Sequence, residues 1–228
     1  MPFDFLKPQE GWRPFAGEVG IIVLGVLIAL GAQQLVEEAQ WRIEIAAFRK
    51  AVNIEVAGNL AAYRYRIQQK PCVQRRIREL DQLGQADRAG IRIDPSVEIG
   101  RPALYSFRTN VWRASSPELM NQLTTEVRLT YSSIYDQLGN VESQLAEERE
   151  VWRNLNGFNN ASLLSEDSRM RLRELIYRAK SVDELIMVNF PVLMSDAAAI
   201  GVKPDFGKLK GHVGPPDPQF CRSLFSES

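Results

Sequence analysis

Apolar residues are densest near the start of the chain. Fourteen consecutive residues from Val19 to Ala32 carry no charged or strongly polar side chain, and they surround a helix on every side. At about 1.5 Å per residue this stretch covers about 21 Å, whereas the hydrocarbon core of a membrane is about 30 Å thick. Extension to residues 15–36 gives enough length and leaves Glu18 and Gln34 near the ends, where polar groups reach the interface. The pattern therefore predicts a transmembrane helix over residues 15–36.

Two other interpretations of this stretch stay open. A helix without a polar face is also stable when it is buried inside a protein. A cleaved secretory signal needs a basic leading region and a cleavage site of small residues. Lys7 and Arg13 are offset by neighbouring acidic residues, although Ala29-Leu30-Gly31 would allow cleavage. Because the helical pattern continues beyond the stretch, we expect an uncleaved anchor behind a short tail of residues 1–14.

Beyond the anchor, apolar residues recur every three or four positions, which predicts a long helix with one apolar stripe. The stripe consists of Trp41, Ile45, Phe48, Val52, Val56, Leu60, Tyr63 and Ile67. Pro71 disfavours helical geometry at Lys70 and suits the first turn of a new helix. We therefore expect the long helix to end there and a short helix to follow as far as Gly84.

The middle of the chain contains a loop and then another long helix. From residue 85 to about residue 106 the periodicity is lost, and scattered glycine and proline residues indicate a structured loop. Ser116 can cap the next helix and Pro117 suits its first position. The helical spacing then continues as far as Leu155, and Asn156-Gly157 provides a stop.

Two further helices are expected near the end of the chain. Ser165 is placed to begin the first of them. Residues 181–184, Ser-Val-Asp-Glu, form a capping box that predicts a second helix, which Gly201 would end. Pro191 is expected to kink this last helix.

Together these elements predict an all-α fold. A transmembrane helix continues into a long helix, and a packed extracytoplasmic helical bundle occupies residues 37–202. Residues 203–228 are rich in proline and glycine and are expected to form an irregular tail. With 228 residues the chain is long enough to bury a sizeable core.

The charged residues give no indication of nucleic-acid binding. Lys and Arg total 28, as do Asp and Glu, so no net field attracts a polyanion. The dense cluster Arg-Arg-Ile-Arg-Glu-Leu at residues 75–80 is interpreted as a solvated helix face. The same interpretation applies to the glutamate pair at residues 37–38 and to Glu147, Glu148 and Glu150. No nucleic-acid partner is therefore expected.

The chain has few residues suited to catalysis or to metal binding. Its one histidine, His212, lies in the glycine-rich tail, where an exposed loop histidine is expected. Two cysteines and one histidine cannot build the usual four-ligand zinc site without carboxylates. The sequence lacks the H-E-x-x-H, G-x-S-x-G and phosphate-loop motifs. We therefore expect no catalytic, cofactor-binding or metal site, and no cofactor.

Cys72 and Cys221 lie almost at opposite ends of the chain that follows the anchor. A disulfide between them would close a long loop and stabilise the fold by several kcal/mol in an oxidising compartment. The basic residues on the two sides of the anchor are nearly balanced, so they do not set its orientation. The cysteine pair favours a short cytoplasmic tail and an extracytoplasmic domain, while two unrelated thiols remain the alternative.

The anchor itself carries two candidate interaction features. Gly25 and Ala29 are small residues four positions apart, a spacing that lets two membrane helices approach closely in a homodimer. Glu18 is an ionisable group at the membrane boundary that would either reach the interface or pair with a polar group of a partner.

The anchor, AGEVGIIVLGVLIALGAQQLVEE, also resembles that of an uncharacterised bacterial family, a domain of unknown function. Members of that family carry Gly-Glu before a hydrophobic span that ends in Gly-x-Leu-Ile-Ala-Leu. The resemblance is carried by Gly17, Glu18, Gly25 and residues 27–30, and more loosely by residues 55–60, Trp112 and residues 131–135. The chain departs from the family at residues 31–34, where such proteins often carry Gln, Asn and Trp soon after the span. The resemblance implies a single-span, largely helical protein and supplies no catalytic residues.

These features lead to one principal hypothesis and two alternatives. The chain is predicted to be a single-pass inner-membrane protein of a Gram-negative bacterium, with a periplasmic helical domain that binds partners or has a structural role. The first alternative is a membrane-anchored enzyme with polar residues in a pocket between residues 41–69 and 117–155. The second is a cleaved, soluble periplasmic protein.

Overall fold

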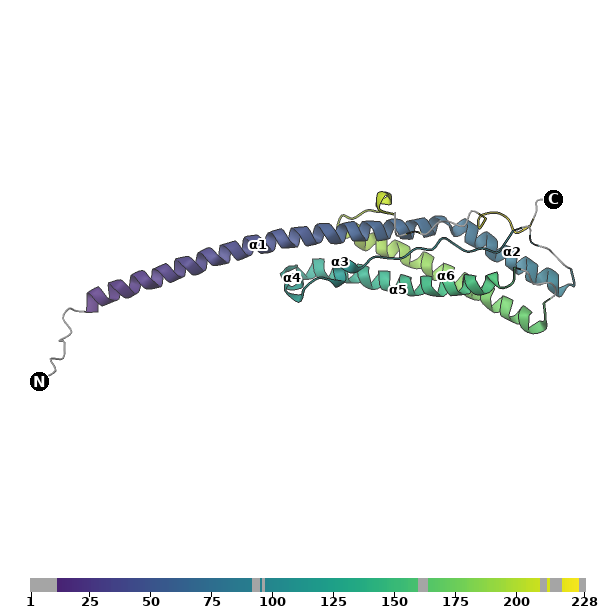
Figure 1. Cartoon of the computed structure of the whole chain (residues 1–228), viewed down its shortest axis with the longest axis horizontal. Helices are drawn as coiled ribbons and strands as arrows, with labels where there is room; N and C mark the ends of the chain where they lie inside the picture. Colours follow the sequence, from purple (N-terminus) through teal and green to yellow (C-terminus); the bar gives the residue numbers. More distant parts are fainter. Residues whose placement is uncertain are drawn as a thin grey trace, which may run out of the picture. The chain divides into compact units, whose positions relative to one another are not determined.

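The computed structural model describes residues 12–91, 95, 97–159, 164–209, 213 and 219–225, with side chains from Gly17 onward. The chain forms two compact units, Met1–Phe48 and Arg49–Ser228. The helices are α1 (Trp12–Gln68), α2 (Lys70–Arg88), α3 (Asn110–Arg113), α4 (Pro117–Gln122), α5 (Thr125–Asn156) and α6 (Glu166–Ala199), followed by the 3₁₀ helix η1 (Phe206–Lys208) (Figure 1). In the described part of the chain the only β-type pairing is an isolated bridge between Tyr105 and Val213. The all-α prediction is confirmed.

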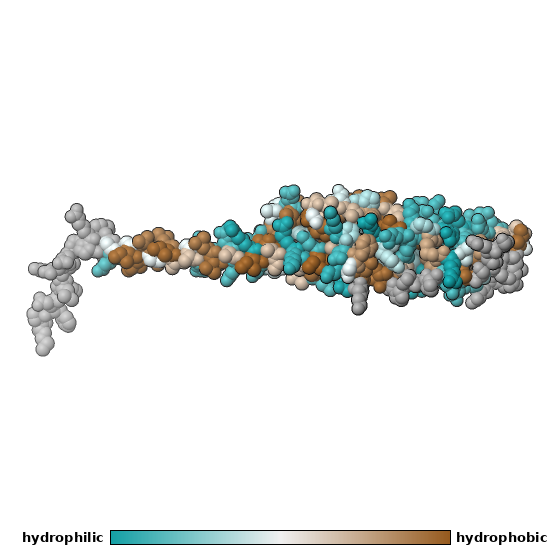
Figure 2. All heavy atoms as spheres, turned by 90° about the horizontal axis from the view of Figure 1, so that it is seen from above, coloured by the Kyte–Doolittle hydropathy of each residue, from teal (hydrophilic) through white to brown (hydrophobic). Residues whose placement is uncertain are grey.

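In the first unit, α1 is an exposed apolar helix. Every side chain from Gly17 to Gln40 is exposed, and Ile21 and Ile28 are 73% and 63% exposed. Figure 2 shows the hydrophobic residues gathered along this helix. The alternative of a buried core helix over residues 19–32 is therefore wrong. The helix is long and apolar enough to cross a membrane, and the same properties suit a signal sequence.

In the second unit, the C-terminal part of α1 packs with α5 and α6. Val52, Val56 and Leu60 of the predicted α1 stripe are fully buried, as the spacing of three or four residues requires. The inward positions of α5 follow the same spacing and include Ile134, Leu138, Val141 and Leu145. These apolar stripes supply the core of the helical bundle.

Helix α2 is longer than predicted. It continues past Gly84 to Arg88, and the left-handed residue Gly90, with φ of 73°, follows its end. The Ile91 N–H donates to the carbonyl of Ala86 at 2.9 Å, which closes the last turn. Gly84 lies inside this helix, and a Cβ there would be 3.7 Å from the Leu172 side chain of α6, an ordinary contact.

The predicted helix over residues 117–155 is divided in two. Ser116 caps α4 as expected, by accepting from the Leu119 N–H at 3.2 Å. The chain then becomes extended at Leu123, which is buried, and Thr124 caps α5 by accepting from the Val127 N–H. The burial of Leu123 outweighs the helical pattern at this point. The end of α5 at Asn156, with Gly157 as its C-cap, matches the prediction.

Helix α6 is continuous, in contrast to the two helices predicted. Ser165 caps its start, and Gly201, with φ of 73°, follows its end, as expected. Residues 181–184 begin no new helix, because the buried positions pass through them without a change of spacing. These positions are Leu172, Leu175, Ala179, Val182, Ile186 and Leu193. Pro191 lies inside the helix.

Candidate functional site

The centre of the second unit contains a buried ion network. Arg66 of α1 is fully buried and forms an ion pair with Glu148 of α5, and its Nη2 donates to Asp183 of α6 at 2.8 Å. Its Nε donates to both carboxylate oxygens of Glu148, at 3.2 and 3.1 Å. One guanidinium therefore joins three helices, because its fork of donors matches two carboxylates at once.

The electrostatics of this centre follow from its burial. Burial by itself would lower the pKa of Arg66, but the charges of Glu148 and Asp183 outweigh it, so the pKa of Arg66 is raised above its usual value. Burial also raises the pKa of the neighbouring Tyr63 and Tyr105 hydroxyls. The Tyr63 hydroxyl donates to the carbonyl of Ile186 on α6. At neutral pH the centre thus contains a charged arginine and neutral tyrosines.

Helix side chains also hold the backbone of the segment between α2 and α4. Asn59 forms a reciprocal pair with Arg108, donating to its carbonyl at 2.7 Å and accepting from its N–H at 2.8 Å. Glu55 accepts from the Val111 N–H at 3.0 Å and from the Tyr135 hydroxyl at 2.6 Å. Burial, together with the hydrogen bond to Glu55, raises the pKa of Tyr135. These buried side chains satisfy backbone groups that have no strand or helix partner.

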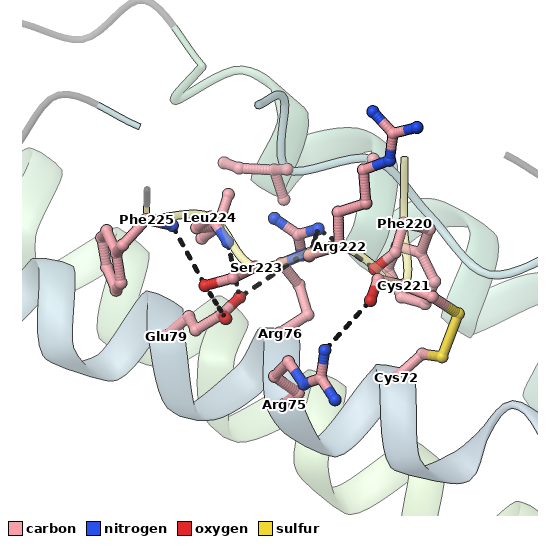
Figure 3. Close-up of polar contacts among 12 residues, drawn as sticks. Cys72, Arg75, Arg76, Glu79, Phe220, Cys221, Arg222, Ser223, Leu224 and Phe225 are labelled. Atoms are coloured by element: carbon pink, nitrogen blue, oxygen red, sulfur yellow. Dashed lines mark hydrogen bonds and ion pairs between the residues drawn. A yellow bond between two sulfur atoms is a disulfide. The ribbon is translucent and has the colours of Figure 1, made fainter. Parts of the chain in front are cut away.

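A second cluster attaches the C-terminal segment, residues 219–225, to α2 (Figure 3). Cys72 and Cys221 form a disulfide with a Cα–Cα distance of 4.8 Å, so the expected bridge is present. Phe220 and Leu224 are buried in the same core as Trp152 and Leu80. The segment is therefore held both covalently and by apolar packing.

Arg76 and Glu79 of α2 bind the backbone of this segment (Figure 3). Arg76 is buried and its Nη2 donates to the carbonyls of Arg222, Phe220 and Gln219 at 2.9, 3.1 and 3.3 Å. Glu79 accepts from the Ser223 hydroxyl at 2.9 Å and from the Leu224 N–H at 3.1 Å. The interpretation of residues 75–80 as a solvated face is therefore wrong for these two residues.

An open groove of about 530 Å³ lies between α2 and α6. Ile77 and Ile176 give it an apolar floor, and Tyr177, which is 73% exposed, stands at its edge. Arg78 and Lys180 lie along it and form no ion pair within the described residues. Acidic side chains also line the groove, namely Asp81, Glu184 and the buried Asp183 of the central network. The groove thus combines an apolar floor with accessible charges of both signs.

The structure brings only some of the predicted residues together. Glu18, Gly25 and Ala29 are exposed on α1, and nothing lies within 4 Å of the position that a Cβ would take at Gly25. Their roles at the membrane stay predictions. His212 lies outside the described residues, and no group of three metal-ligating side chains occurs among those that are described.

The sequence interpretation missed the buried charges. Glu148 was assigned to a solvated face with Glu147 and Glu150, yet it is buried against Arg66. Its place at the helical spacing Val141, Leu145, Glu148 and Trp152 is the one signal that identifies it as inward-facing. Arg66 also lies at helical spacing, three residues after Tyr63, although the predicted stripe continues to Ile67 instead.

Comparison of the chain with family models, with curated proteins and with solved structures gives no match.

Proposed function

We propose that the chain is a single-pass inner-membrane protein of a Gram-negative envelope, of the kind its anchor resembles, and that its helical unit binds a partner protein in the periplasm. The α2–α6 groove carries this proposal. It is an open groove of about 530 Å³ between two helices. Its apolar floor and its charges suit a partner segment, such as an amphipathic helix, with an apolar face and charged edges.

The exposed apolar helix and the disulfide support the proposed location. A helix with apolar side chains on all sides is stable in lipid, and a disulfide persists in oxidising compartments such as the periplasm. A reporter fused after Ser228 tests the orientation. Alkaline phosphatase should be active there and green fluorescent protein dark, and the reverse result would place the domain in the cytoplasm.

The buried polar groups support binding rather than catalysis. The enzyme alternative places polar residues between residues 41–69 and 117–155, and Arg66 and Glu148 do meet in that region. Both are buried and bonded to one another, so they serve to join helices. Accessible polar groups do line the α2–α6 groove.

Photo-cross-linking tests the groove. A photoreactive phenylalanine analogue replaces Tyr177 in the groove or, as the matched control, Leu129, which is 61% exposed on α5. In living cells we expect a defined cross-linked protein from position 177 and none from position 129. The variant Arg78→Glu with Lys180→Glu should weaken that cross-link at least fivefold. Equal products from both positions, or no effect of the charge reversal, would contradict binding in the groove.

A further inference from the structure

One apolar face continues along the exposed part of α1, from residues 19–32, which are apolar on every side, into the charged residues that follow. Its members alternate at spacings of three and four residues, which is the seven-residue repeat of a coiled coil. They are Ile22, Gly25, Ala29, Ala32, Val36, Ala39, Ile43 and Ala46, and we call them the α1 seam. All of them are exposed in the single chain. The seam covers four repeats and about 36 Å of helix.

The seam continues beyond the apolar span into the charged part of the helix. Glu37, Glu38, Arg42 and Glu44 all lie off the seam. Arg42 donates to Glu38 at 2.6 Å and Gln33 donates to Glu37 at 2.8 Å, so polar residues here find partners within the helix. Val36 and Ile43 on the seam are 57% and 71% exposed. This separation of charge leaves an apolar face that no other part of the described chain covers.

Lipid does not account for the whole seam. Residues 37–46 follow the predicted span and contain four charged side chains, so lipid is not expected to cover Ala39, Ile43 and Ala46. A repeat of 3.5 residues remains on one face over four repeats when two helices coil around each other. The face therefore points to another helix as its occupant.

We propose that the occupant is the α1 seam of a second copy of this chain, in a parallel and in-register pair. This pairing rests on the membrane anchoring proposed above, because two copies inserted with the same orientation have parallel helices. In such a pair each seam residue meets its own counterpart, so every opposed pair is small or apolar and no charge is buried. Gly25, Ala29 and Ala32 let the helices approach closely in lipid. Val36 at the end of the span and Ile43 beyond it complete the contact between the two helices.

The repeat also places the residues that flank the contact. Leu35 and Ala47 lie beside the seam and extend its apolar surface, and Leu35 is 70% exposed. Glu18 would come next in the repeat before Ile22 and lies at the predicted membrane boundary, where its exposed carboxylate reaches water.

Cysteine cross-linking in native membranes tests the pairing. The variants Ala39→Cys on the seam and Gln34→Cys on the opposite face are made in the full chain, with the native disulfide left intact. After mild oxidation we expect Ala39→Cys to give at least ten times more reducible dimer on a gel than Gln34→Cys. Equal dimer yields from the two positions, or no dimer from either, would overturn the proposal.

A charge substitution provides an independent measurement. Ala39→Arg should convert the detergent-solubilised protein from dimer to monomer by light scattering, whereas Gln34→Arg should leave the dimer unchanged. Dimers with both variants, or a monomeric parent protein, would overturn the pairing. Loss of membrane anchoring can be told apart from loss of pairing. Without anchoring the protein would leave the membrane pellet, whereas cross-linking at position 39 would still show whether the α1 seams meet.

Discussion

At the scale of single residues, Arg66 should be the most sensitive position in the helical unit. Arg66→Met leaves Glu148 and Asp183 buried without a cation, and removal of one partner from a buried ion pair typically costs about 3–5 kcal/mol. The matched control is Arg178→Met, since the pair of Arg178 with Glu147 is exposed and should contribute less than about 1 kcal/mol. Urea unfolding followed by circular dichroism measures both. Equal losses of unfolding free energy in the two variants would show that the buried ion network contributes no more to stability than the exposed ion pair.

The buried tyrosines should make the fold sensitive to alkali. Burial raises the pKa of Tyr63, Tyr105 and Tyr135 above the value of about 10 expected in the unfolded chain. Below pH 10 both states keep these protons, so the contribution to stability is fully present. Above pH 10 the unfolded chain releases protons that the folded chain retains, so the free energy of unfolding falls as pH rises.

Urea unfolding at pH 8, 10 and 11 measures this dependence. The variant Tyr105→Phe should shift stability at pH 8 by less than about 1 kcal/mol, because the Tyr105 hydroxyl has no hydrogen-bond partner among the described residues. The same variant should show a smaller loss between pH 10 and 11 than the parent. An unchanged pH dependence would show that Tyr105 ionises equally in the folded and unfolded states.

Individual charged residues were the part of the site that the sequence predicted least well. Arg76 and Glu148 belong to charged clusters that resemble solvated helix faces, and their burial depends on partners that are distant in the chain. Arg76 meets the carbonyl of Arg222, and Glu148 meets Arg66. Local patterns carry no information about such pairs. The disulfide was easier to predict, because a chain with two cysteines allows only one pairing.

At the scale of elements, substitution of capping residues should show where helices begin in the folded protein. Thr124 caps α5, so Thr124→Ala should cost about 0.5–2 kcal/mol. Ser181 has the sequence of a cap but lies inside α6, where Ser181→Ala should be neutral or stabilising by about 0.5 kcal/mol. Thermal unfolding of the two variants gives the comparison. A loss for Ser181→Ala as large as that for Thr124→Ala would contradict a continuous α6.

Most helices were predictable, and the errors lie at their ends. The apolar spacing identified α1, α5 and α6 because buried stripes must repeat with the period of the helix. It failed at Leu123, where a buried residue with an extended backbone separates two helices, and at Gly84, where the helix continues through a glycine. Residues 181–184 show that a capping sequence is tolerated inside a helix when the buried spacing continues through it.

At the scale of the whole molecule, the disulfide should be the largest single covalent contribution to stability. The cysteines are 149 residues apart, and closure of a loop of that length restricts the unfolded chain by about 5 kcal/mol in the entropic model. Cys72→Ser with Cys221→Ser should therefore lower the unfolding free energy by about 2–5 kcal/mol. In this variant the terminal segment should stay bound at low denaturant through its contacts with Arg76 and the burial of Phe220 and Leu224. Limited proteolysis after Gln219 would detect its release.

The position of the bridge has a further consequence for cleaved forms of the protein. Every described helix after α2 lies between Cys72 and Cys221 in the sequence, so the polypeptide closes into a covalent ring that contains them. A protease that cuts the ring once produces two fragments that remain joined. Such a nicked molecule would migrate near full length without reductant and as two pieces with it. With the membrane anchoring proposed above, both severed parts would stay attached to one anchor.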